Sequence, residues 1–363
     1  MKRKVLVVIT TGFFDFGGLT TVMLNYYRKL NKENLIIDFA STNIPSETDK
    51  SFIYIKEKGA KYYCLGNRQK NTASYLMKLY GVIKENKYDV VHINGNSATM
   101  CLDLLAAKLA GCRIRISHGH TTRSDHPFVH KLLRPLLLRN STLRIAVSDA
   151  TGKWLYGSNY ITLNNVIDSL RYKYDPDIRE SLRRQLGLEG CFVLGNVGKL
   201  YAAKNQKFLI DILKVVIQYN SKTKLVLAGG GELENELKEY SKQLNVFDHV
   251  VFLGMRDDIP DILQTFDVFL FPSIYEGLGL ALIEAQASGL NCLASTAVPR
   301  ETRVTNNVAY YSLEETADNW ACKILEIHNF NRGEESIRAI ESIKKCGYDA
   351  YEEAHKLSDI YLM

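Results

Sequence analysis

Short apolar runs alternate with longer amphipathic segments along most of the chain. In the first half, runs with the length and hydrophobicity of buried strands occur at 5–9, 35–39, 61–64, 88–93, 113–117 and 142–147. Segments with helical spacing separate them, at 19–30, 48–58, 73–85 and 100–110. Strands that alternate with helices predict a parallel sheet covered by helices.

The second half repeats this alternation. Strand-like runs occur at 192–197, 224–228, 250–253 and 268–271, with helical segments at 206–218, 233–244 and 280–288. A polar segment, 172–185, separates the two halves, and 363 residues are enough for two domains. We therefore predict an α/β protein with Rossmann-like domains at 1–168 and 169–345, followed by a helical tail.

Composition excludes several classes of protein. Hydrophobic residues make up 46% and charged residues 24%, which is typical of a packed globular chain. No apolar run approaches 18 residues, and the run at 5–9 is too short for a signal peptide, so we expect a first strand there. The net charge of +6 is modest and gives no reason to expect nucleic acid as a partner.

The cysteines and one acidic pair bear on compartment and metal binding. Seven scattered cysteines without a C-x-x-C pair favour a reducing cytoplasm and argue against a zinc site. Asp175-Pro176-Asp177 has the form of an acidic metal motif but follows no apolar strand. We interpret it as a solvated turn with a helix N-cap, and we predict no metal site.

The stretch 268–285 combines a strand, a glycine loop and a helix. Such a helix N-terminus presents free N–H groups and a dipole that favour a phosphate. Glu276 lies in the loop, and Glu284 lies in the helix roughly 7–8 Å further along at about 1.5 Å per residue. A nucleotide sugar could span this distance, with sugar hydroxyls at Glu276 and ribose hydroxyls at Glu284. The alternative is two solvated glutamates.

Lysines follow the strand 192–197. Lys199 and Lys204 lie in the loop at its carboxyl end, which is the ligand edge of a parallel sheet. Two ammonium groups there could neutralise a departing nucleoside diphosphate, whereas the alternative is a pair of surface lysines.

The loop 11–18 in the first half could belong to a dinucleotide-binding site. It contains Gly17 and Gly18, and Asp38 follows about 20 residues later, as in a dinucleotide-binding βαβ unit. The compact G-x-G-x-x-G spacing is absent. An NAD-dependent oxidoreductase with Asp38 on a ribose is therefore the alternative function, and glycines that only form a tight turn are a further possibility.

The run FPSIYEGLGLALIEAQASG resembles the Glu-x7-Glu signature of retaining glycosyltransferase family 4, and the chain is most similar to capsular and exopolysaccharide enzymes. Segment 163–168 resembles the family's interdomain junction, with Val166 in place of the usual glycine. The resemblance implies a GT-B fold, in which two Rossmann-like domains face each other across a cleft. It also implies that the last helix, within 346–363, packs back on the first domain.

The resemblance further implies roles for particular residues. Catalytic roles fall to Glu276, His118, Lys199 and Lys204, with Lys199 in place of the family's usual arginine. The donor would be bound by Gly17, Gly18, Lys199, Lys204, Gly230, Arg256, Glu276, Gly277, Leu278, Gly279 and Glu284. The acceptor would contact His118 or His120, since His118 matches best by its position after the strand 113–117. A solvated loop histidine remains the alternative, and His92 is interpreted as structural.

These implications lead to one predicted function. We expect a cytoplasmic, metal-independent, retaining transferase that uses a UDP-sugar as co-substrate and no cofactor. The acceptor would be a glycan or a polyprenyl-linked sugar. A catalytically inactive GT-B partner subunit is the remaining alternative, against which the intact Glu276, Glu284, Lys199 and Lys204 argue.

Segment 123–139 mixes apolar and basic residues. From 128 to 139 they alternate at near-helical spacing, as in an interfacial helix, so we predict peripheral contact with the inner face of the membrane. An ordinary helix whose leucines face the core is the alternative, and Pro135 would limit helix continuity unless it lay in a first turn.

Overall fold

The computed structural model describes residues 2–10, 18–124, 126–327 and 331–363, which form two compact units. Unit 1 comprises residues 1–166 together with 350–363, and unit 2 comprises residues 167–349. The chain therefore enters unit 2 two residues before the boundary expected at 168 and leaves it four residues after the one expected at 345.

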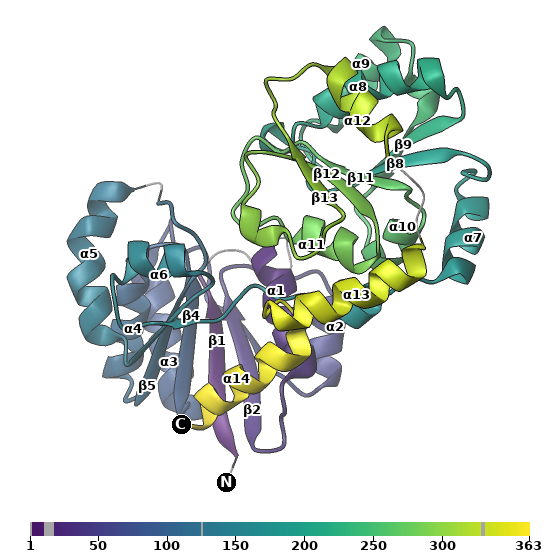
Figure 1. The fold of residues 1–363 in the computed structure, drawn as a ribbon. Coiled ribbons are helices and arrows are strands. Elements are labelled where there is room, and N and C mark those ends of the chain that lie inside the picture. The colour runs from purple at the N-terminus through teal and green to yellow at the C-terminus, as the bar shows by residue number, and fades with distance from the viewer. Residues whose placement is uncertain (1, 11–17, 125, 328–330) are drawn as a thin grey trace. The chain divides into compact units, whose positions relative to one another are not determined.

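Unit 1 is built on a seven-stranded parallel sheet of order β3-β2-β1-β4-β5-β6-β7 (Figure 1). Its strands are β1 (Arg3–Ile9), β2 (Leu35–Ser41), β3 (Tyr62–Cys64), β4 (Val90–Gly95), β5 (Ile114–Gly119), β6 (Leu143–Ala146) and β7 (Ile161–Thr162). The helices between them are α1 (Gly18–Lys29), α2 (Lys50–Glu57), α3 (Thr72–Asn86), α4 (Met100–Leu109), α5 (Pro127–Asn140) and α6 (Asp149–Leu155). The central strands are buried on both faces, which explains their continuous apolar runs.

Unit 2 has a six-stranded parallel sheet of order β10-β9-β8-β11-β12-β13. Its strands are β8 (Phe192–Val197), β9 (Thr223–Ala228), β10 (Val250–Gly254), β11 (Val268–Phe271), β12 (Asn291–Ser295) and β13 (Val308–Tyr311). Its helices are α7 (Pro176–Gln185), α8 (Gln206–Tyr219), α9 (Glu234–Gln243), α10 (Ile259–Gln264), α11 (Leu280–Ala287), α12 (Ala317–Leu325) and α13 (Arg332–Lys345), with a 3-10 turn η1 (Ser169–Tyr172). The strand order reverses between β8 and β11, which is where ligands bind in open sheets of this kind.

The last helix, α14 (Ala350–Leu362), belongs to unit 1 although the preceding helices belong to unit 2. It packs against α1 and β1, as Figure 1 shows in yellow. Its buried face includes Ala354, Leu357 and Tyr361. The residues of α14 therefore complete a core whose other members lie more than 150 positions earlier in the chain.

Two local interpretations made from the sequence can be compared with the fold. Asp175 caps α7, and its carboxylate accepts hydrogen bonds from the N–H groups of Asp177 and Ile178, which confirms the turn. Strand β5 extends through Gly119, so His118 lies inside the strand and the prediction of a loop position was wrong. The strand is longer because β4 and β6 both pair with it as far as Gly119.

Candidate active site

The switch point of unit 2 brings together the two loops that the sequence singled out. The loop after β8 carries Lys199 and Lys204, and the loop after β11 carries Glu276. Because β8 and β11 are adjacent and parallel, their carboxyl ends meet at one edge of the sheet. The two loops also bond directly, since the N–H of Ile274 donates to the carbonyl of Ala203 at 2.8 Å.

Lys204 and Glu276 form an ion pair at this edge. The ammonium group of Lys204 lies 2.5 Å from Oε1 of Glu276, and their side chains are only 14% and 8% exposed. The same ammonium lies 4.9 Å from the ring centre of Phe271. These contacts hold one cation and one carboxylate in fixed positions, and within the described ranges no ion pair engages the second carboxylate oxygen. The sequence predicted both residues but not their pairing.

The glycines before α11 differ in their structural role. Gly279 has φ +90°, and a Cβ there would lie 3.1 Å from the ring of Phe271, so this N-cap position requires glycine. Gly277 is exposed, and a Cβ there would have no neighbour within 4 Å. Leu278 packs against the core of unit 2 and anchors the loop. The first N–H groups of α11 are thereby presented next to the ion pair.

Glu284 lies on α11 and is buried. Burial raises the pKa of its carboxyl group, and Tyr172, Arg171 and Lys204 act in the opposite direction. Tyr172 comes from η1 and also has its pKa raised, chiefly by burial and then by Glu284. A buried carboxylate beside a hydroxyl donor and two cations is suited to accept hydrogen bonds from a ligand. Tyr172 and Arg171 were missed in the sequence because they lie in a different element.

The other donor-site candidates of unit 2 discussed next, Lys199, Arg256 and Gly230, differ in exposure and in their contacts. Lys199 is exposed, and its carbonyl accepts from the side chain of Gln206. Arg256 forms a two-pronged ion pair with Asp258, which engages two of its guanidinium nitrogens. A Cβ on Gly230 would meet the side chain of Met255 at 2.8 Å, so packing already explains this glycine.

Three residues of unit 1, namely Gly17, Gly18 and Asp38, suggested a dinucleotide site. Gly17 lies outside the described residues, whereas Gly18 is the exposed first residue of α1. Asp38 lies within β2, where its carboxylate accepts from the N–H of Lys61 at 2.7 Å and from the hydroxyl of Tyr88 at 2.6 Å. Both contacts are structural, so the assignment of Asp38 to a ribose was wrong and the oxidoreductase alternative loses its key residue.

Three histidines form a cluster at the carboxyl edge of the unit 1 sheet. His118 is fully buried, whereas His120 follows the strand and is half-buried, with Nε2 bonded to the Asn94 side chain at 2.9 Å. Their rings lie 4.2 Å apart. Of the two, His120 is therefore the one that a ligand reaches without rearrangement. Burial lowers the pKa of His92 and of His120 to about 3, so both are neutral at pH 7.

A chain of hydrogen bonds fixes the protonation of His118. The hydroxyl of Tyr361 lies 2.7 Å from Nδ1 of His92, whose Nε2 lies 3.2 Å from Nδ1 of His118. The described residues offer the Tyr361 hydroxyl no acceptor other than His92, so it donates there and places the His92 proton on Nε2. His118 then accepts at Nδ1 and carries its proton on the buried Nε2. Tyr361 comes from α14 and could not be linked to this site from the sequence.

Helix α5 exposes part of its apolar surface. Phe128, Leu132 and Leu136 are 80%, 66% and 46% exposed, whereas Leu137 is buried and Leu133 and Leu138 pack against the core. The alternative that its leucines face the core therefore holds for Leu133, Leu137 and Leu138 and fails for Leu132 and Leu136. The helix continues through Pro135, which lies on the exposed side where water can solvate the carbonyl that lacks a donor.

No metal-binding cluster and no helix able to cross a membrane occur in the described residues. In residues 2–10, 18–124, 126–327 and 331–363, no group of three or more His, Cys, Asp or Glu residues is placed to hold a metal ion. Within the same part of the chain, no helix combines the length and apolar character needed to cross a bilayer.

Two family models and several curated proteins are similar to this chain in sequence. Residues 178–345 match the family described as glycosyl transferases group 1, and residues 16–159 match Glycosyltransferase Family 4. EpsF of Bacillus subtilis (strain 168) is 30% identical over 99% of this chain and 96% of its own. The UDP-Gal:alpha-D-GlcNAc-diphosphoundecaprenol alpha-1,3-galactosyltransferase of Escherichia coli is 30% identical over 79% of this chain and 78% of its own.

Solved structures agree in fold. Anabaena HepE, crystallised with UDP-glucose, has a TM-score of 0.78 and 21% identity, with 98% of each chain covered. WaaG, a glycosyltransferase involved in lipopolysaccharide biosynthesis, has a TM-score of 0.72 and 16% identity over 98% of this chain and 99% of its own. These likenesses establish the two-domain GT-B architecture.

Proposed function

This chain belongs to glycosyltransferase family 4 and acts in polysaccharide biosynthesis, and from that premise we propose its reaction. The protein transfers a sugar from a UDP-sugar to a lipid-linked glycan acceptor, with retention of configuration and without a metal ion. The Lys204–Glu276 pair beside the α11 N-terminus is the observation that carries this proposal. It joins a phosphate-binding cation to a carboxylate at the ligand edge of the sheet.

Each part of the donor has a group of matching chemistry in unit 2. Glu276 accepts hydrogen bonds from the sugar hydroxyls, and Glu284 accepts them from the ribose. The N–H groups of α11, Lys204 and the exposed Lys199 take the negative charge of the diphosphate. Lys204 acts on both carboxylates, since it pairs with Glu276 and also lowers the pKa of Glu284.

The proposed bond changes need no protein nucleophile. The bond between the sugar C1 and the UDP oxygen breaks while the acceptor hydroxyl oxygen bonds to C1 from the same face. The acceptor proton moves to the leaving phosphate oxygen. Positive groups around that phosphate stabilise the charge that develops as the bond breaks, which lowers the barrier without a metal ion.

The identities of donor and acceptor are supported by relatives. HepE has been crystallised with UDP and with UDP-glucose, and the Escherichia coli relative is named for a UDP-galactose donor and a diphosphoundecaprenol-linked acceptor. A polyprenyl chain lies in a bilayer, so its enzyme must reach the membrane surface. We place the protein in the cytoplasm, at the inner face of the membrane, with α5 as the contact.

Calorimetry with UDP tests the donor site directly. In excess chelator, UDP is expected to bind with the same affinity as in the presence of magnesium, and Lys204→Gln is expected to weaken it about tenfold. Hydrolysis of a panel of UDP-sugars then identifies the donor. Affinity that disappears with the metal would refute the assignment of phosphate neutralisation to the lysines, and a chain that binds no UDP-sugar would favour an inactive partner subunit.

A further inference from the structure

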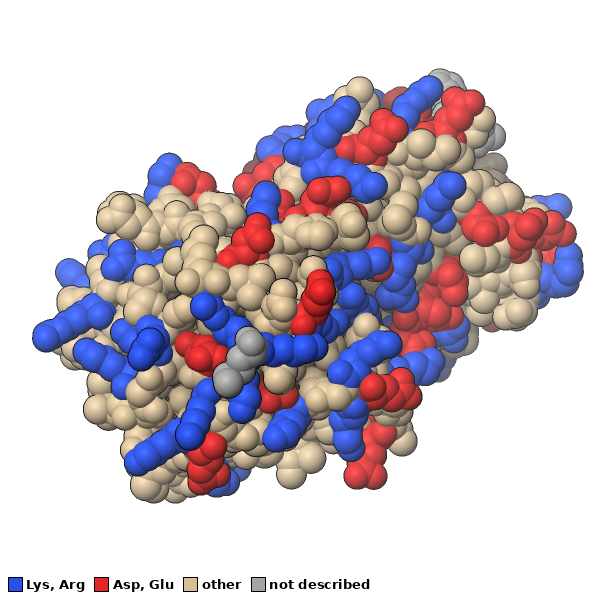
Figure 2. Space-filling model, turned by 90° about the horizontal axis from the view of Figure 1, so that it is seen from below, with Lys and Arg blue, Asp and Glu red and all other residues tan. Residues whose placement is uncertain are grey.

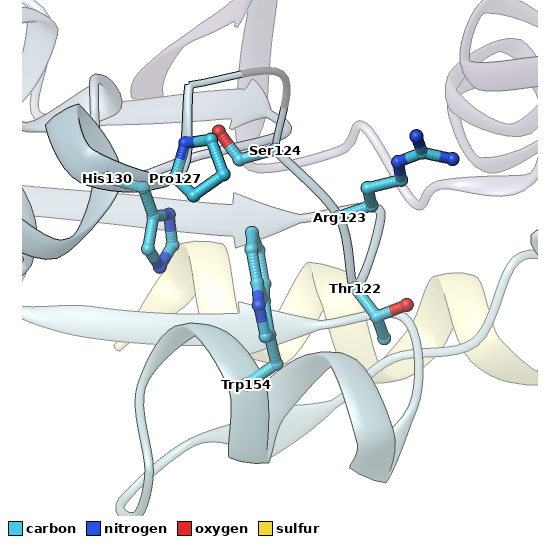
Figure 3. A pocket seen from close by; sticks show the side chains of 6 residues that line it. All are labelled: Thr122, Arg123, Ser124, Pro127, His130 and Trp154. Carbon is cyan, nitrogen blue, oxygen red and sulfur yellow. The ribbon is translucent and has the colours of Figure 1, made fainter.

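Unit 1 contains a pocket that the donor site does not explain. Its cavity measures about 640 Å³, within the ~300–1,000 Å³ typical of small-molecule sites. It lies between the loop after β5, the first turn of α5 and helix α6, as Figure 3 shows. The residues that line it are Thr122, Arg123, Ser124, Pro127, His130 and Trp154. We call it the Trp154 pocket.

The indole of Trp154 forms a rigid wall of this pocket. Figure 3 shows its ring edge-on, with His130 against one face and Thr122 and Arg123 on the side of the other. The His130 and Trp154 rings are stacked, with centres 4.2 Å apart and planes 25° from parallel. His130 is itself buried and held in place, because its Nδ1 accepts the N–H of Ala98 at 3.3 Å. His130 thus covers one indole face, and the opposite face is directed toward Thr122 and Arg123 (Figure 3).

The His130 ring that stacks on the indole carries no charge. Burial lowers the pKa of His130, and the cation of Arg134 lowers it further, so the imidazole is neutral at pH 7. Because Nδ1 is an acceptor, the ring proton is on Nε2. A neutral ring keeps the stacked pair apolar on its faces and leaves Arg123 as the cation of the pocket.

Thr122 and Arg123 lie on the side of the indole away from His130, and Ser124 lies above its edge beside Pro127 (Figure 3). Arg123 is exposed, and among the described residues its guanidinium makes no ion pair. Its backbone N–H donates to the hydroxyl of Thr121. The hydroxyls of Thr122 and Ser124 lie on the same loop. An aromatic wall with nearby hydroxyls and one cation suits a ligand with an apolar ring face, hydroxyl edges and a negative group. A pyranose attached to a diphosphate has all three features.

We propose that the Trp154 pocket binds the sugar diphosphate head of a lipid-linked acceptor. This inference rests on the proposed function and specifies its acceptor subsite. The C–H face of the sugar packs on the free face of Trp154, its hydroxyls bond to Thr122 and Ser124, and the diphosphate pairs with the guanidinium of Arg123.

The surroundings explain why the ligand is linked to a lipid. Pro127 lines the pocket and is the first residue of α5, and the next residue, Phe128, is 80% exposed. The exposed apolar side of α5 therefore starts at the rim of the pocket. A head group held at Trp154 would have its hydrocarbon chain directed along a surface that already favours a bilayer.

Soluble acceptor analogues test the proposal in the full chain. The probes are short-chain alkyl diphosphates that carry glucose, galactose or N-acetylglucosamine, together with the same alkyl diphosphate without a sugar. The chain has two tryptophans, and Trp320 is fully buried in unit 2, so quenching by a ligand reports on Trp154. We expect at least one sugar probe to quench the fluorescence and the sugar-free probe to bind about tenfold more weakly.

Variants separate stacking from charge. Trp154→Leu is expected to raise the acceptor KM about tenfold with little change in kcat, whereas Trp154→Phe keeps an aromatic face and is expected to raise it far less. Arg123→Gln is expected to weaken the sugar and sugar-free probes equally. Arg139→Gln is the matched control, because it removes an exposed arginine of the same region that does not line the pocket.

The outcomes also separate this proposal from the proposed function. If UDP binds and sugar is transferred, but no probe quenches Trp154 and Trp154→Leu keeps the parental acceptor KM, the acceptor subsite is refuted and the reaction stands. If UDP itself does not bind, the proposed reaction fails. Since Trp154 belongs to unit 1 and UDP binds in unit 2, an unchanged unfolding temperature of the unit 1 transition serves as the check that Trp154→Leu is folded.

Discussion

At the scale of single residues, the donor site depends on charges that are paired before any ligand arrives. Glu276 is bonded to Lys204 and Glu284 is buried beside Tyr172. The sequence could identify these glutamates and the lysine because a strand-loop-helix pattern fixes which edge of the sheet they occupy. It could not identify their partners, since Tyr172 reaches Glu284 only through the packing of η1 on α11.

Replacing Glu276 should affect transfer and spare the nucleotide. Glu276→Gln keeps the shape of the side chain but weakens the hold on the sugar and on Lys204, so kcat should fall about 100-fold while UDP affinity stays within about threefold. Steady-state kinetics and calorimetry measure the two effects. Glu239→Gln on the exposed face of α9 is the control, and equal losses of kcat and UDP affinity would contradict the assignment of Glu276 to the sugar.

The raised pKa of Glu284 gives nucleotide binding a pH dependence. The carboxyl group of Glu284 accepts hydrogen bonds from the ribose hydroxyls fully only when it is deprotonated. Because burial raises the pKa of this group, UDP affinity should fall as the pH drops through that raised value. In the Glu284→Gln variant the side chain at position 284 cannot titrate. The ratio of parental to variant UDP affinity should therefore rise with pH, since titration of the phosphate is common to both. A ratio that is independent of pH would remove Glu284 from the nucleotide site.

Tyr361 should control the tautomer of His118. Tyr361→Phe removes the donor to His92, so the buried ring protons can redistribute and the Nε2–H form of His118 should decrease in nitrogen NMR spectra. The loss of one buried hydrogen bond should also cost about 1 kcal/mol of stability. Tyr156→Phe is the control, because its hydroxyl donates to the Ser117 carbonyl outside this chain of bonds. The same tautomer change in both variants would disprove the relay.

At the scale of elements, the fold was largely predictable and the exposed surfaces were not. Strands β8 and β11 were predicted at their observed bounds because their short runs end at a glycine, Gly198, and at a proline, Pro272. The end of β5 was predicted two residues short, because its length depends on pairing with β4 and β6. The Trp154 pocket was not predictable, since the stacking of His130 on Trp154 arises only when α5 and α6 pack together.

Helix α5 should bind anionic membranes through its exposed apolar residues. Basic side chains are frequent on the part of the surface that belongs to unit 1 at the left of Figure 2, where few acidic ones interrupt them. Leu132→Gln combined with Leu136→Gln should reduce sedimentation with anionic vesicles. Lys131→Gln should weaken binding to anionic vesicles by about 1 kcal/mol and lower the preference of the protein for anionic over neutral lipid.

The matched control for α5 changes two exposed apolar residues elsewhere in unit 1. Met77 and Leu109 are 67% and 69% exposed and lie on α3 and α4. Their replacement by Gln should leave vesicle binding unchanged. Equal binding of all variants, or none by the parental chain, would remove α5 as a membrane contact.

At the scale of the whole molecule, the order of residues along the chain differs from their order in space. The chain leaves unit 1 at Val166, forms unit 2, and returns as α14 to complete the core of unit 1. Arg3, near the start of β1, bonds to the carbonyl of Tyr361 at 3.0 Å, which ties the two ends together. Unit 1 therefore depends on residues that follow unit 2 in the chain, whereas unit 2 is one continuous segment.

Removal of residues 350–363 tests this dependence. It exposes the apolar surface of unit 1 that Ala354, Leu357 and Tyr361 cover, and it removes the donor to His92, so unit 1 should unfold at a markedly lower temperature. The residues to which the proposed function assigns UDP, namely Lys199, Lys204, Glu284 and the start of α11, lie in unit 2, so UDP should still raise the temperature of the second transition by mass action. Calorimetric scans with and without UDP measure both events. If truncation abolished the UDP-dependent transition as well, unit 2 could not fold without the completed first unit, and the donor site would depend on both units together.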